Sequence, residues 1–309
     1  MKNKKKRIRI SEYFQMRIAS LEAERRFSTA ANYKCTLRSI EAHFSGKVLW
    51  LDQLNRSNLN QYNKALYERG LSRNTVSFYN RILRAVCNRA AEEGYAAGSG
   101  CFAHLYTGVE NTKKRALSET VMRRIIHFDP GKDANLALSR DLFLFSFYCR
   151  GMSFVDIAYL TSNNIVGEYL TYARHKTGQR LVVHIEPCIR EIISRYSGTP
   201  YLFPVIHSKD PRKAYHEYIN HLHRHNLLLK ELGRQCGATV PLNSHAARHS
   251  WATISRNMGT SISLISSALG HTSETTTRIY LESISQADVD SINRKLQRYL
   301  FSDKRIRMK

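Results

Sequence analysis

The chain has 309 residues, of which 42% are hydrophobic and 24% are charged, and this describes a globular protein with room for two domains. Its 48 Lys and Arg residues outnumber 25 Asp and Glu residues and leave a formal net charge of +23, which is spread over both halves of the chain. These positive charges repel one another unless a polyanion compensates them, so we expect a nucleic-acid partner ahead of an anionic membrane. No stretch approaches the roughly 20 consecutive apolar residues of a membrane-spanning helix, and no apolar signal region follows the basic start, so we expect a soluble cytoplasmic protein with no membrane partner.

Residues 1–97 predict an N-terminal bundle of four helices. Apolar residues recur at helical spacing in four runs, and residues that commonly begin or end helices bound these runs. Ser28 precedes the second run, and Gly70 ends the third. Ser72 and Gly94 bound the fourth run, whose polar face is basic. We therefore expect a small helical domain with a cationic side.

A linker is predicted over residues 98–115. The helical pattern gives way there to Gly-Ser-Gly, scattered polar residues and the basic triplet Lys113, Lys114 and Arg115. Residues 116–309 then form a second domain.

The second domain combines helices with one β-rich region. A helical region starts at Leu117-Ser118, and the apolar run 136–148 predicts a buried helix. Two β-rich runs, 168–175 and 180–185, flank a turn that contains Gly178, which is typical of a hairpin. A short third strand is expected over 164–166, and helices return after Ile185. The fold class is therefore mainly α: an N-terminal helical bundle plus an α+β domain with a small antiparallel β-sheet.

Three short motifs near the end of the sequence carry side chains suited to phosphate chemistry. In the first, Ser244-His245-Ala246-Ala247-Arg248-His249, residues His245 and Arg248 are three apart and share one face of a helix. In the second, Leu269-Gly270-His271, the glycine ends a helix and leaves His271 at its edge. The third ends in Tyr280. Each motif alone is weak, because a lone His or Tyr more often packs or lies on the surface, but their joint order and spacing are specific.

The order HxxRH, LGH and TTxxY resembles the active-site signature of the tyrosine recombinase family, which includes phage integrases and chromosome-dimer resolvases. Lys176 in Arg174-His175-Lys176-Thr177-Gly178 matches the lysine that this family carries at the tip of a β-hairpin. The first domain is similar to the SAM-like core-binding domain of the family, so the resemblance spans nearly the whole chain. It implies a site-specific DNA recombinase that catalyses integration, excision or inversion.

The resemblance also implies a separate chemical role for each motif residue. Tyr280 would attack a DNA phosphodiester and form a covalent 3′-phosphotyrosyl link, which leaves a free 5′-hydroxyl. Arg248 would neutralise charge on the non-bridging oxygens, with His245 and His271 donating further hydrogen bonds. His245 is the candidate proton acceptor for the tyrosine, and Lys176 would protonate the leaving 5′-oxygen. Strand exchange would pass through a Holliday junction without ATP, metal ion or other cofactor.

One segment departs from the family pattern. The family carries its first catalytic arginine in a stretch that reads roughly T-G-L-R-x-x-E/D-L, and the corresponding residues here run from Arg150 to Ile157. Aligning on Gly151 and Asp156 places Ser153 where the arginine should be. Arg150 lies about one helical turn earlier and is the candidate to deliver its guanidinium to the same phosphate. The alternative is that Arg150 is an ordinary surface or DNA-backbone residue.

The implied partner is double-stranded DNA with specific recombination sites. Most of the DNA contacts would go to phosphates, which position the protein without reading sequence. The expected contacts are Arg73, Asn74, Arg81, Arg84, Lys113, Lys114 and Arg115. Residues 287–301, which are apolar at helical spacing, would dock on a neighbouring protomer in a tetramer on DNA, and the alternative is that they fold onto their own domain. Accessory DNA-bending proteins complete the expected partners.

Two functions of other classes stay open. The serine at position 153 is compatible with a DNA-binding factor that has lost catalysis, and the tyrosine chemistry is shared with type IB topoisomerases. His221 and His225 have the i, i+4 spacing of zinc ligands, but no third ligand is evident, so no metal site is expected and we interpret them as a solvated or DNA-facing surface. The six cysteines are far apart in sequence and are interpreted as buried free thiols.

Overall fold

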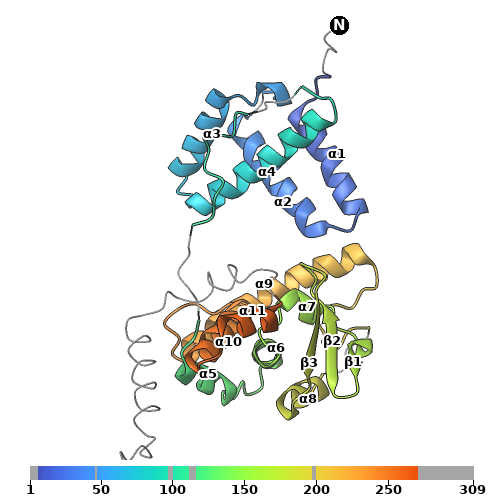
Figure 1. Ribbon diagram of the computed structural model, residues 1–309, viewed down its shortest axis with the longest axis vertical. Coiled ribbons are helices and arrows are strands. Elements are labelled where there is room, and N and C mark those ends of the chain that lie inside the picture. The colour runs from blue at the N-terminus through green and yellow to red at the C-terminus, as the bar shows by residue number, and fades with distance from the viewer. Residues whose placement is uncertain (1–5, 46, 97–99, 111–115, 197–199, 271–309) are drawn as a thin grey trace, which may run out of the picture. The chain divides into compact units, whose positions relative to one another are not determined.

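The computed structural model describes residues 6–45, 47–96, 100–110, 116–196 and 200–270, and the chain divides between Thr112 and Lys113 into two compact units. Both units are mainly helical, and the second also holds a small sheet (Figure 1). Over these residues, no helix is both long enough and apolar enough to cross a membrane. The predicted fold class is therefore confirmed.

Four helices build the first unit, as predicted: α1 (Ile10–Ala23), α2 (Phe27–His43), α3 (Arg56–Glu68) and α4 (Arg73–Glu92), with a 3-10 helix η1 (Leu51–Gln53) between α2 and α3. The Ser72 hydroxyl accepts a hydrogen bond from the N–H of Thr75 at 3.3 Å and satisfies one of the donors that the start of α4 leaves without a helical partner. Gly70 follows α3 with a φ of +76°, a left-handed conformation that glycine adopts without strain. Local sequence signals thus set both helix ends.

Side chains from all four helices form the core of the first unit. Tyr13, Ile40, Tyr62 and Leu83 come from α1 to α4 in turn and are fully buried. The hydroxyl groups of Tyr62 and Ser39 lie 2.8 Å apart and share a hydrogen bond. The polar tip of the buried tyrosine is therefore satisfied, and its ring contributes apolar area to the core.

A segment after α4, residues 100–110, lies along this helix and is called the α4 strap below. Phe102 is only 3% exposed and belongs to the core of the first unit. The Ser77 hydroxyl donates to the carbonyl of Gly108 at 2.6 Å, and the Asn80 amide donates to the carbonyl of Tyr106 at 3.3 Å. The linker predicted over 98–115 includes this segment because its Gly and polar residues show no periodic pattern. In the structure, one apolar anchor and polar side chains of α4 hold the strap within the first unit.

A buried pair of amides joins α3 to α4 at the strap. The Asn63 amide donates to the Asn80 side-chain carbonyl at 3.1 Å, and the Asn80 amide donates back at 2.8 Å. Because Asn80 also donates to the carbonyl of Tyr106, the same side chain holds two segments together. An amide left buried without its partner would cost about 1–3 kcal/mol, so the pair favours this one arrangement.

The second unit begins with three helices, α5 (Glu119–Ile126), α6 (Ala134–Tyr148) and α7 (Phe154–Ala158), and a 3-10 helix η2 (Ser162–Asn164). The strands β1 (Ile165–Val166), β2 (Tyr169–Ala173) and β3 (Arg180–His184) follow. Four more helices complete its described part: α8 (Pro187–Ser194), α9 (Pro211–Gln235), α10 (Ala246–Asn257) and α11 (Ile262–Leu269).

The three strands form one antiparallel sheet in the order β1-β2-β3. Thr171 of β2 lies opposite Val182 of β3, so the predicted hairpin is confirmed. Along β2, Leu170 and Tyr172 point to the buried face, and the same alternation continues to Arg174 just beyond the strand. The turn that follows, with Gly178 at a φ of +70°, carries Lys176.

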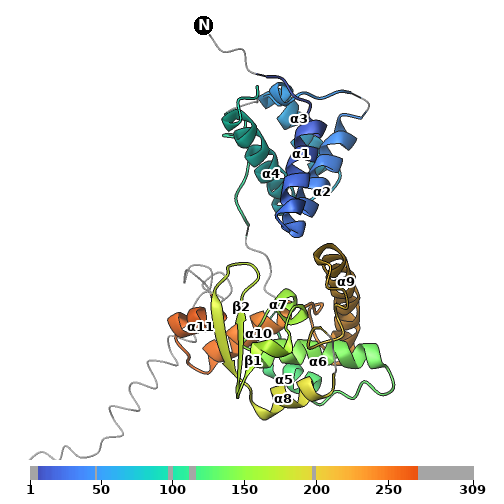
Figure 2. The same ribbon diagram turned by 90° about the vertical axis from the view of Figure 1, so that its right-hand side faces the viewer.

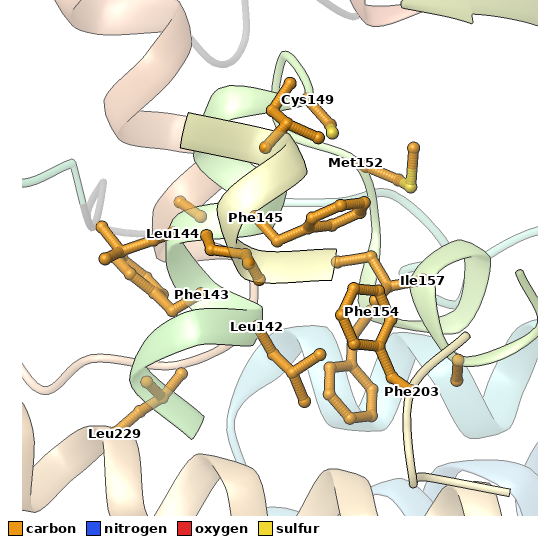
Figure 3. Close-up of a cluster of buried hydrophobic side chains, with 14 of the residues drawn as sticks. Leu142, Phe143, Leu144, Phe145, Cys149, Met152, Phe154, Ile157, Phe203 and Leu229 are labelled. Atoms are coloured by element: carbon orange, nitrogen blue, oxygen red, sulfur yellow. The ribbon is translucent and has the colours of Figure 1, made fainter. Parts of the chain in front are cut away.

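Helix α6 forms the centre of the second core. Four consecutive residues, Leu142, Phe143, Leu144 and Phe145, are 5% exposed or less, so this helix is covered on all sides as predicted from its apolar run (Figure 3). The rings of Phe145 and Phe203 meet edge to face with their centroids 4.9 Å apart. Helices α7, α8, α9 and α10 all pack against α6, which fixes the elements that carry the candidate site.

The histidines of α9 do not share one surface. His216 and His223 are exposed, but His225 is only 4% exposed and stacks on Phe154 with the ring centroids 4.6 Å apart. The interpretation of His225 as a solvated or DNA-facing residue is therefore wrong. The reason is its position on the same face of α9 as Leu229, one turn further on, which is fully buried. All six cysteines are free thiols, three of them buried and three half-buried.

Candidate active site

The start of α10 presents the first predicted pair. His245 is the N-cap residue of α10 and is exposed, while Arg248 lies one turn further on and is 5% exposed. The loop before the helix is fixed, because the Asn243 side-chain carbonyl accepts the N–H groups of His245 at 3.0 Å and Ala246 at 3.1 Å. The HxxR spacing thus places an exposed imidazole beside a buried guanidinium.

The guanidinium of Arg248 joins three segments of the second unit. Its Nη1 donates to the carbonyl of Gly151 at 2.8 Å, and its Nη2 donates to the carbonyl of Leu269 at 2.6 Å. Hydrogen bonds from a charged donor are roughly twice as strong as neutral ones, so these two contacts hold the side chain in one orientation. Arg248 therefore connects α10 to the turn between α6 and α7 and to the end of α11.

The turn between α6 and α7 is shaped to approach Arg248. Gly151 has a φ of +72°, and a Cβ built there would lie 2.7 Å from the Cα of Arg248. The preceding Arg150 also has a positive φ, of 59°, which costs a non-glycine residue roughly 1–3 kcal/mol. Two successive left-handed residues end α6 and turn the chain directly into the site.

Ser153, at the position where the resemblance implies an arginine, is the N-cap of α7. Its hydroxyl donates to Oδ2 of Asp156 at 2.6 Å and accepts the Asp156 N–H at 3.4 Å. The other carboxylate oxygen of Asp156 accepts the N–H of His175 at 2.7 Å. The turn that carries Ser153 is thus hydrogen-bonded to the end of β2.

The hairpin that carries Lys176 is fixed at its base. The N–H of Arg174 donates to the carbonyl of Gln179 at 2.8 Å, and the Gly178 N–H donates to the carbonyl of Arg174 at 2.8 Å. The Arg174 guanidinium donates through Nη1 to the carbonyl of Gly270 at the end of α11, and β2 lies next to α11 in Figure 2. Lys176 itself is exposed at the turn. The flexible amine of Lys176 therefore extends from a hairpin that is hydrogen-bonded to α7 and to the end of α11.

The structure brings together part of the predicted constellation. Arg248 and Arg174, which lies in the hairpin of Lys176, both bind the C-terminal end of α11, and Asp156 links the Ser153 turn to this hairpin. Gly270 ends α11 with a φ of +63°, as predicted. His245 begins α10 three residues before Arg248. His271 and Tyr280 lie outside the described residues, as do Lys113, Lys114, Arg115 and residues 287–301.

Sequence analysis missed Arg174 as a site residue. Arg174 is 9% exposed, and its guanidinium reaches the residue before His271. The alternation along β2 carried the signal, because Leu170, Tyr172 and Arg174 have the period-two spacing of one strand face. A charged residue in register with two buried apolar ones indicates a function, since buried charges are rare.

Burial dominates the electrostatics around the two guanidiniums. Tyr172 of β2 is 6% exposed, and burial raises the pKa of its hydroxyl, with a further increase from the Asp156 carboxylate. Arg248 and Arg174 oppose this effect and lower the pKa of the same hydroxyl. The Tyr172 hydroxyl therefore lies in the electrostatic field of both guanidiniums.

The α4 strap occupies part of the predicted DNA-binding face of the first unit. Arg73 pairs with the Glu110 carboxylate at 2.9 Å, and its guanidinium lies 4.0 Å from the centroid of the Tyr106 ring. Asn74 exchanges two hydrogen bonds with the backbone of Glu110, at 2.7 and 3.0 Å. These two side chains hold the strap.

Two other residues of this face differ in their contacts. Arg84 donates to the Thr107 hydroxyl at 3.3 Å, and Arg81 is exposed. The contact of all four α4 residues with DNA stays a prediction.

Comparison with protein families gives two matches along the chain. Residues 115–286 match the phage integrase family, and residues 9–102 match the phage integrase SAM-like domain. A tyrosine recombinase XerA from Pyrococcus furiosus is 28% identical over 179 residues, which cover 56% of this chain and 58% of that protein. A tyrosine recombinase from Pseudothermotoga lettingae is 31% identical over 70 residues, which cover 23% of this chain and 24% of that protein. The chain thus aligns with less than two thirds of the length of either relative.

Solved structures share the fold of this chain. A lambda integrase dimer bound to a COC′ core site has a TM-score of 0.63 at 13% identity, and the match covers 88% of this chain and 95% of the integrase chain. A Tn1549 transposon integrase in complex with transposon right end DNA has a TM-score of 0.63 at 14% identity and covers 94% and 99%. A lambda integrase tetramer bound to a Holliday junction has the same TM-score at 14% identity and covers 89% and 78%. At this identity, the likeness shows a common fold.

Proposed function

Because the chain belongs to the phage integrase family of tyrosine recombinases, we propose that it breaks and rejoins DNA strands at specific sites through Tyr280. The observation that carries this proposal is the buried guanidinium of Arg248, held between the carbonyls of Gly151 and Leu269. A guanidinium fixed in this way can neutralise a phosphate under attack without having to reorganise. His245 is exposed at the start of the same helix, and Lys176 is exposed on the hairpin whose Arg174 binds the residue after Leu269.

In the proposed reaction the phenolic oxygen of Tyr280 forms a bond to phosphorus, and the bond from phosphorus to the 5′-oxygen breaks. His245 accepts the phenolic proton, and Lys176 donates a proton to the leaving 5′-oxygen. Arg248 and His271 donate hydrogen bonds to the non-bridging oxygens as negative charge develops there. The 3′-phosphotyrosyl link retains the energy of the phosphodiester, so a second 5′-hydroxyl reverses the step without ATP and strand exchange passes through a Holliday junction.

The proposed partner is double-stranded DNA with recombination sites, in the cytoplasm. A lambda integrase dimer on a core site and a lambda integrase tetramer on a Holliday junction support a working form of several protomers on DNA. We propose four protomers, with residues 287–301 docked on a neighbouring copy, and accessory DNA-bending proteins where the site requires a bend. The Tn1549 integrase bound to transposon end DNA supports a role in a mobile element.

Contacts between the first unit and DNA phosphates form a second part of the proposal. Arg81 is exposed on α4 and suits a backbone contact directly. Arg73, Asn74 and Arg84 are proposed contacts that share their donors with the α4 strap. The basic triplet 113–115 would add further phosphate contacts.

Mapping covalent adducts across a whole genome tests the proposal, because the sample then contains every candidate target sequence. The full chain is incubated with sheared DNA of the source genome, the mixture is denatured, and the fragments that stay linked to protein are sequenced. We expect 3′-linked adducts at a few defined positions and none with Tyr280→Phe. Adducts that persist in this variant would refute the proposal. DNA binding without adducts would indicate a factor that has lost catalysis, and relaxation of supercoiled DNA without site preference would indicate a topoisomerase.

A further inference from the structure

Two arginines are less than a tenth exposed in the described part of the chain, and both lie at the candidate site. Arg248 is 5% exposed and Arg174 is 9% exposed. A buried charge carries a desolvation penalty of several kcal/mol unless a counter-charge or hydrogen bonds offset it. The second guanidinium has no role in the function proposed above, so its position requires an explanation.

The two guanidiniums converge on one end of α11. Arg248 donates to the carbonyl of Leu269 at 2.6 Å, and Arg174 donates to the carbonyl of Gly270, the next residue. Because Leu269 and Gly270 are consecutive residues, both guanidiniums bind the same short stretch of backbone. The position after Gly270 belongs to His271, a proposed phosphate ligand. Arg174 thus borders the same place as Arg248 and approaches it from the hairpin.

The described residues supply Arg174 with a carbonyl and with no carboxylate within ion-pair distance. The nearby acid Asp156 is engaged elsewhere, since its two oxygens bind the Ser153 hydroxyl and the His175 N–H. A guanidinium has five N–H donors in a planar fork that matches a phosphate, and the Gly270 carbonyl takes one of them. An anion from outside the chain, such as a DNA phosphodiester, would offset the cost of burying this cation.

The hydrogen bonds of Asp156 connect Ser153, at the position where the family carries its first catalytic arginine, to the residue that follows Arg174. Ser153 stands where the family places an arginine, and its hydroxyl binds Asp156, which in turn binds the residue after Arg174. We infer that Arg174 supplies the second guanidinium of the phosphate site, in the role that Ser153 cannot fill. The inference rests on the proposed function, because it assigns a further group to the same phosphate.

Arg174 fits this role better than Arg150. Arg150 is half-exposed on the turn after α6, whereas Arg174 is buried and is oriented by a hydrogen bond at the edge of the site. Arg174 donates N–H groups to a non-bridging oxygen while Tyr280 attacks, and neither forms nor loses a covalent bond. The phenolic proton still goes to His245 and the 5′-oxygen still takes its proton from Lys176, so the step stays balanced.

The test compares two substrates that differ in charge at one phosphorus. A nicked duplex carrying a site found by adduct mapping is made with either an ordinary phosphodiester or a methylphosphonate at the cleaved position. The methyl group removes the negative charge that a guanidinium would neutralise. We expect Arg174→Ala to lower the rate of adduct formation about 10²–10³-fold on the phosphodiester, and by less than about a tenth of that factor on the methylphosphonate.

The same preparation of the variant meets both substrates, so a general loss of folding would affect both equally. Arg180→Ala is the matched control, because Arg180 lies at the start of β3 in the same hairpin and is exposed. We expect this control to cleave both substrates at nearly the wild-type rate.

Three results would overturn the inference. Near-normal cleavage of the phosphodiester by Arg174→Ala would do so, and so would an equal loss on both substrates, which indicates a purely structural role. Selective rescue of Arg150→Ala by the methylphosphonate, without rescue of Arg174→Ala, would assign the charge to Arg150. A wild-type chain that forms no adduct dependent on Tyr280 would instead refute the proposed function itself, and the inference with it.

Discussion

Replacing Gly151 by alanine is the most direct way to disturb Arg248 without touching its charge. A Cβ at position 151 would lie 2.7 Å from the Cα, 2.8 Å from the Cγ and 2.9 Å from the Cβ of Arg248. These distances are shorter than normal carbon contacts of about 3.5–4.0 Å, and two of the atoms belong to the rigid first part of the residue. The turn or the start of α10 must therefore move.

The expected loss of stability has two parts. A left-handed φ of +72° costs an alanine about 1 kcal/mol relative to glycine. Overpacking against Arg248 adds about 1–3 kcal/mol, because the neighbouring backbone cannot rotate away as a flexible side chain would. We expect the free energy of unfolding of the second unit to fall by about 2–4 kcal/mol. A displacement of the guanidinium by about 1 Å would also slow adduct formation about 10²-fold.

Gly131→Ala separates the cost of the left-handed backbone from the cost of overpacking against Arg248. Gly131 lies in the same unit with a φ of +59°, but a Cβ there would have no neighbour within 4 Å, so this variant should lose about 1 kcal/mol and keep its cleavage activity. Urea unfolding is followed by tryptophan fluorescence in a Trp50→Phe background, so that Trp251, which packs against α11, reports on the second unit alone. If both glycine variants lose the same stability and cleave equally well, the contact with Arg248 does not matter and the reasoning is wrong.

Two further predictions concern buried polar side chains. Burial lowers the pKa of His225 from its ordinary 6.5 to about 3, so the unfolded chain binds a proton that the folded chain does not, and the free energy of unfolding falls as the pH decreases below 6.5. His225→Phe should remove roughly 2–3 kcal/mol of the difference in unfolding free energy between pH 7 and pH 4.5, measured by urea unfolding. An unchanged pH dependence would contradict this. Asn80→Ala removes the partner of the Asn63 amide and the donor to the Tyr106 carbonyl. This variant should lower the free energy of unfolding by about 1–3 kcal/mol and speed amide hydrogen exchange in the α4 strap. Exchange at the wild-type rate would show that the strap is held by its other contacts alone.

Local signals predicted the helices and the hairpin because short-range chemistry determines where these elements begin and end. Ser72 caps α4 through a contact three residues away, and Gly178 provides the left-handed residue of the hairpin turn. The α4 strap could not be predicted in the same way. Its anchors are one buried phenylalanine, Phe102, and side chains of α4 that lie 26 to 36 residues away from their partners in the sequence. No periodic pattern encodes such pairings.

The candidate site was predictable in its residue types and only partly in its geometry. The spacing of His245 and Arg248 correctly placed both at the start of one helix. The contacts of Arg248 with Gly151 and Leu269 depend on the approach of segments 97 and 21 residues away, which no single motif contains. His225 was misplaced because the interpretation counted histidines and overlooked the apolar face of α9 to which this residue belongs.

Two acceptors of Arg248, at Gly151 and Leu269, are main-chain carbonyl groups, and this has a consequence for mutational tolerance. No point mutation at positions 151 or 269 can delete a carbonyl, so many substitutions near the site should leave the orientation of the guanidinium intact as long as the backbone keeps its path. An insertion or deletion between α6 and α7, or at the end of α11, shifts the carbonyls themselves and should inactivate the site. Engineering of new DNA specificity should therefore keep Gly151 and the lengths of these two loops constant and vary the other side chains around them.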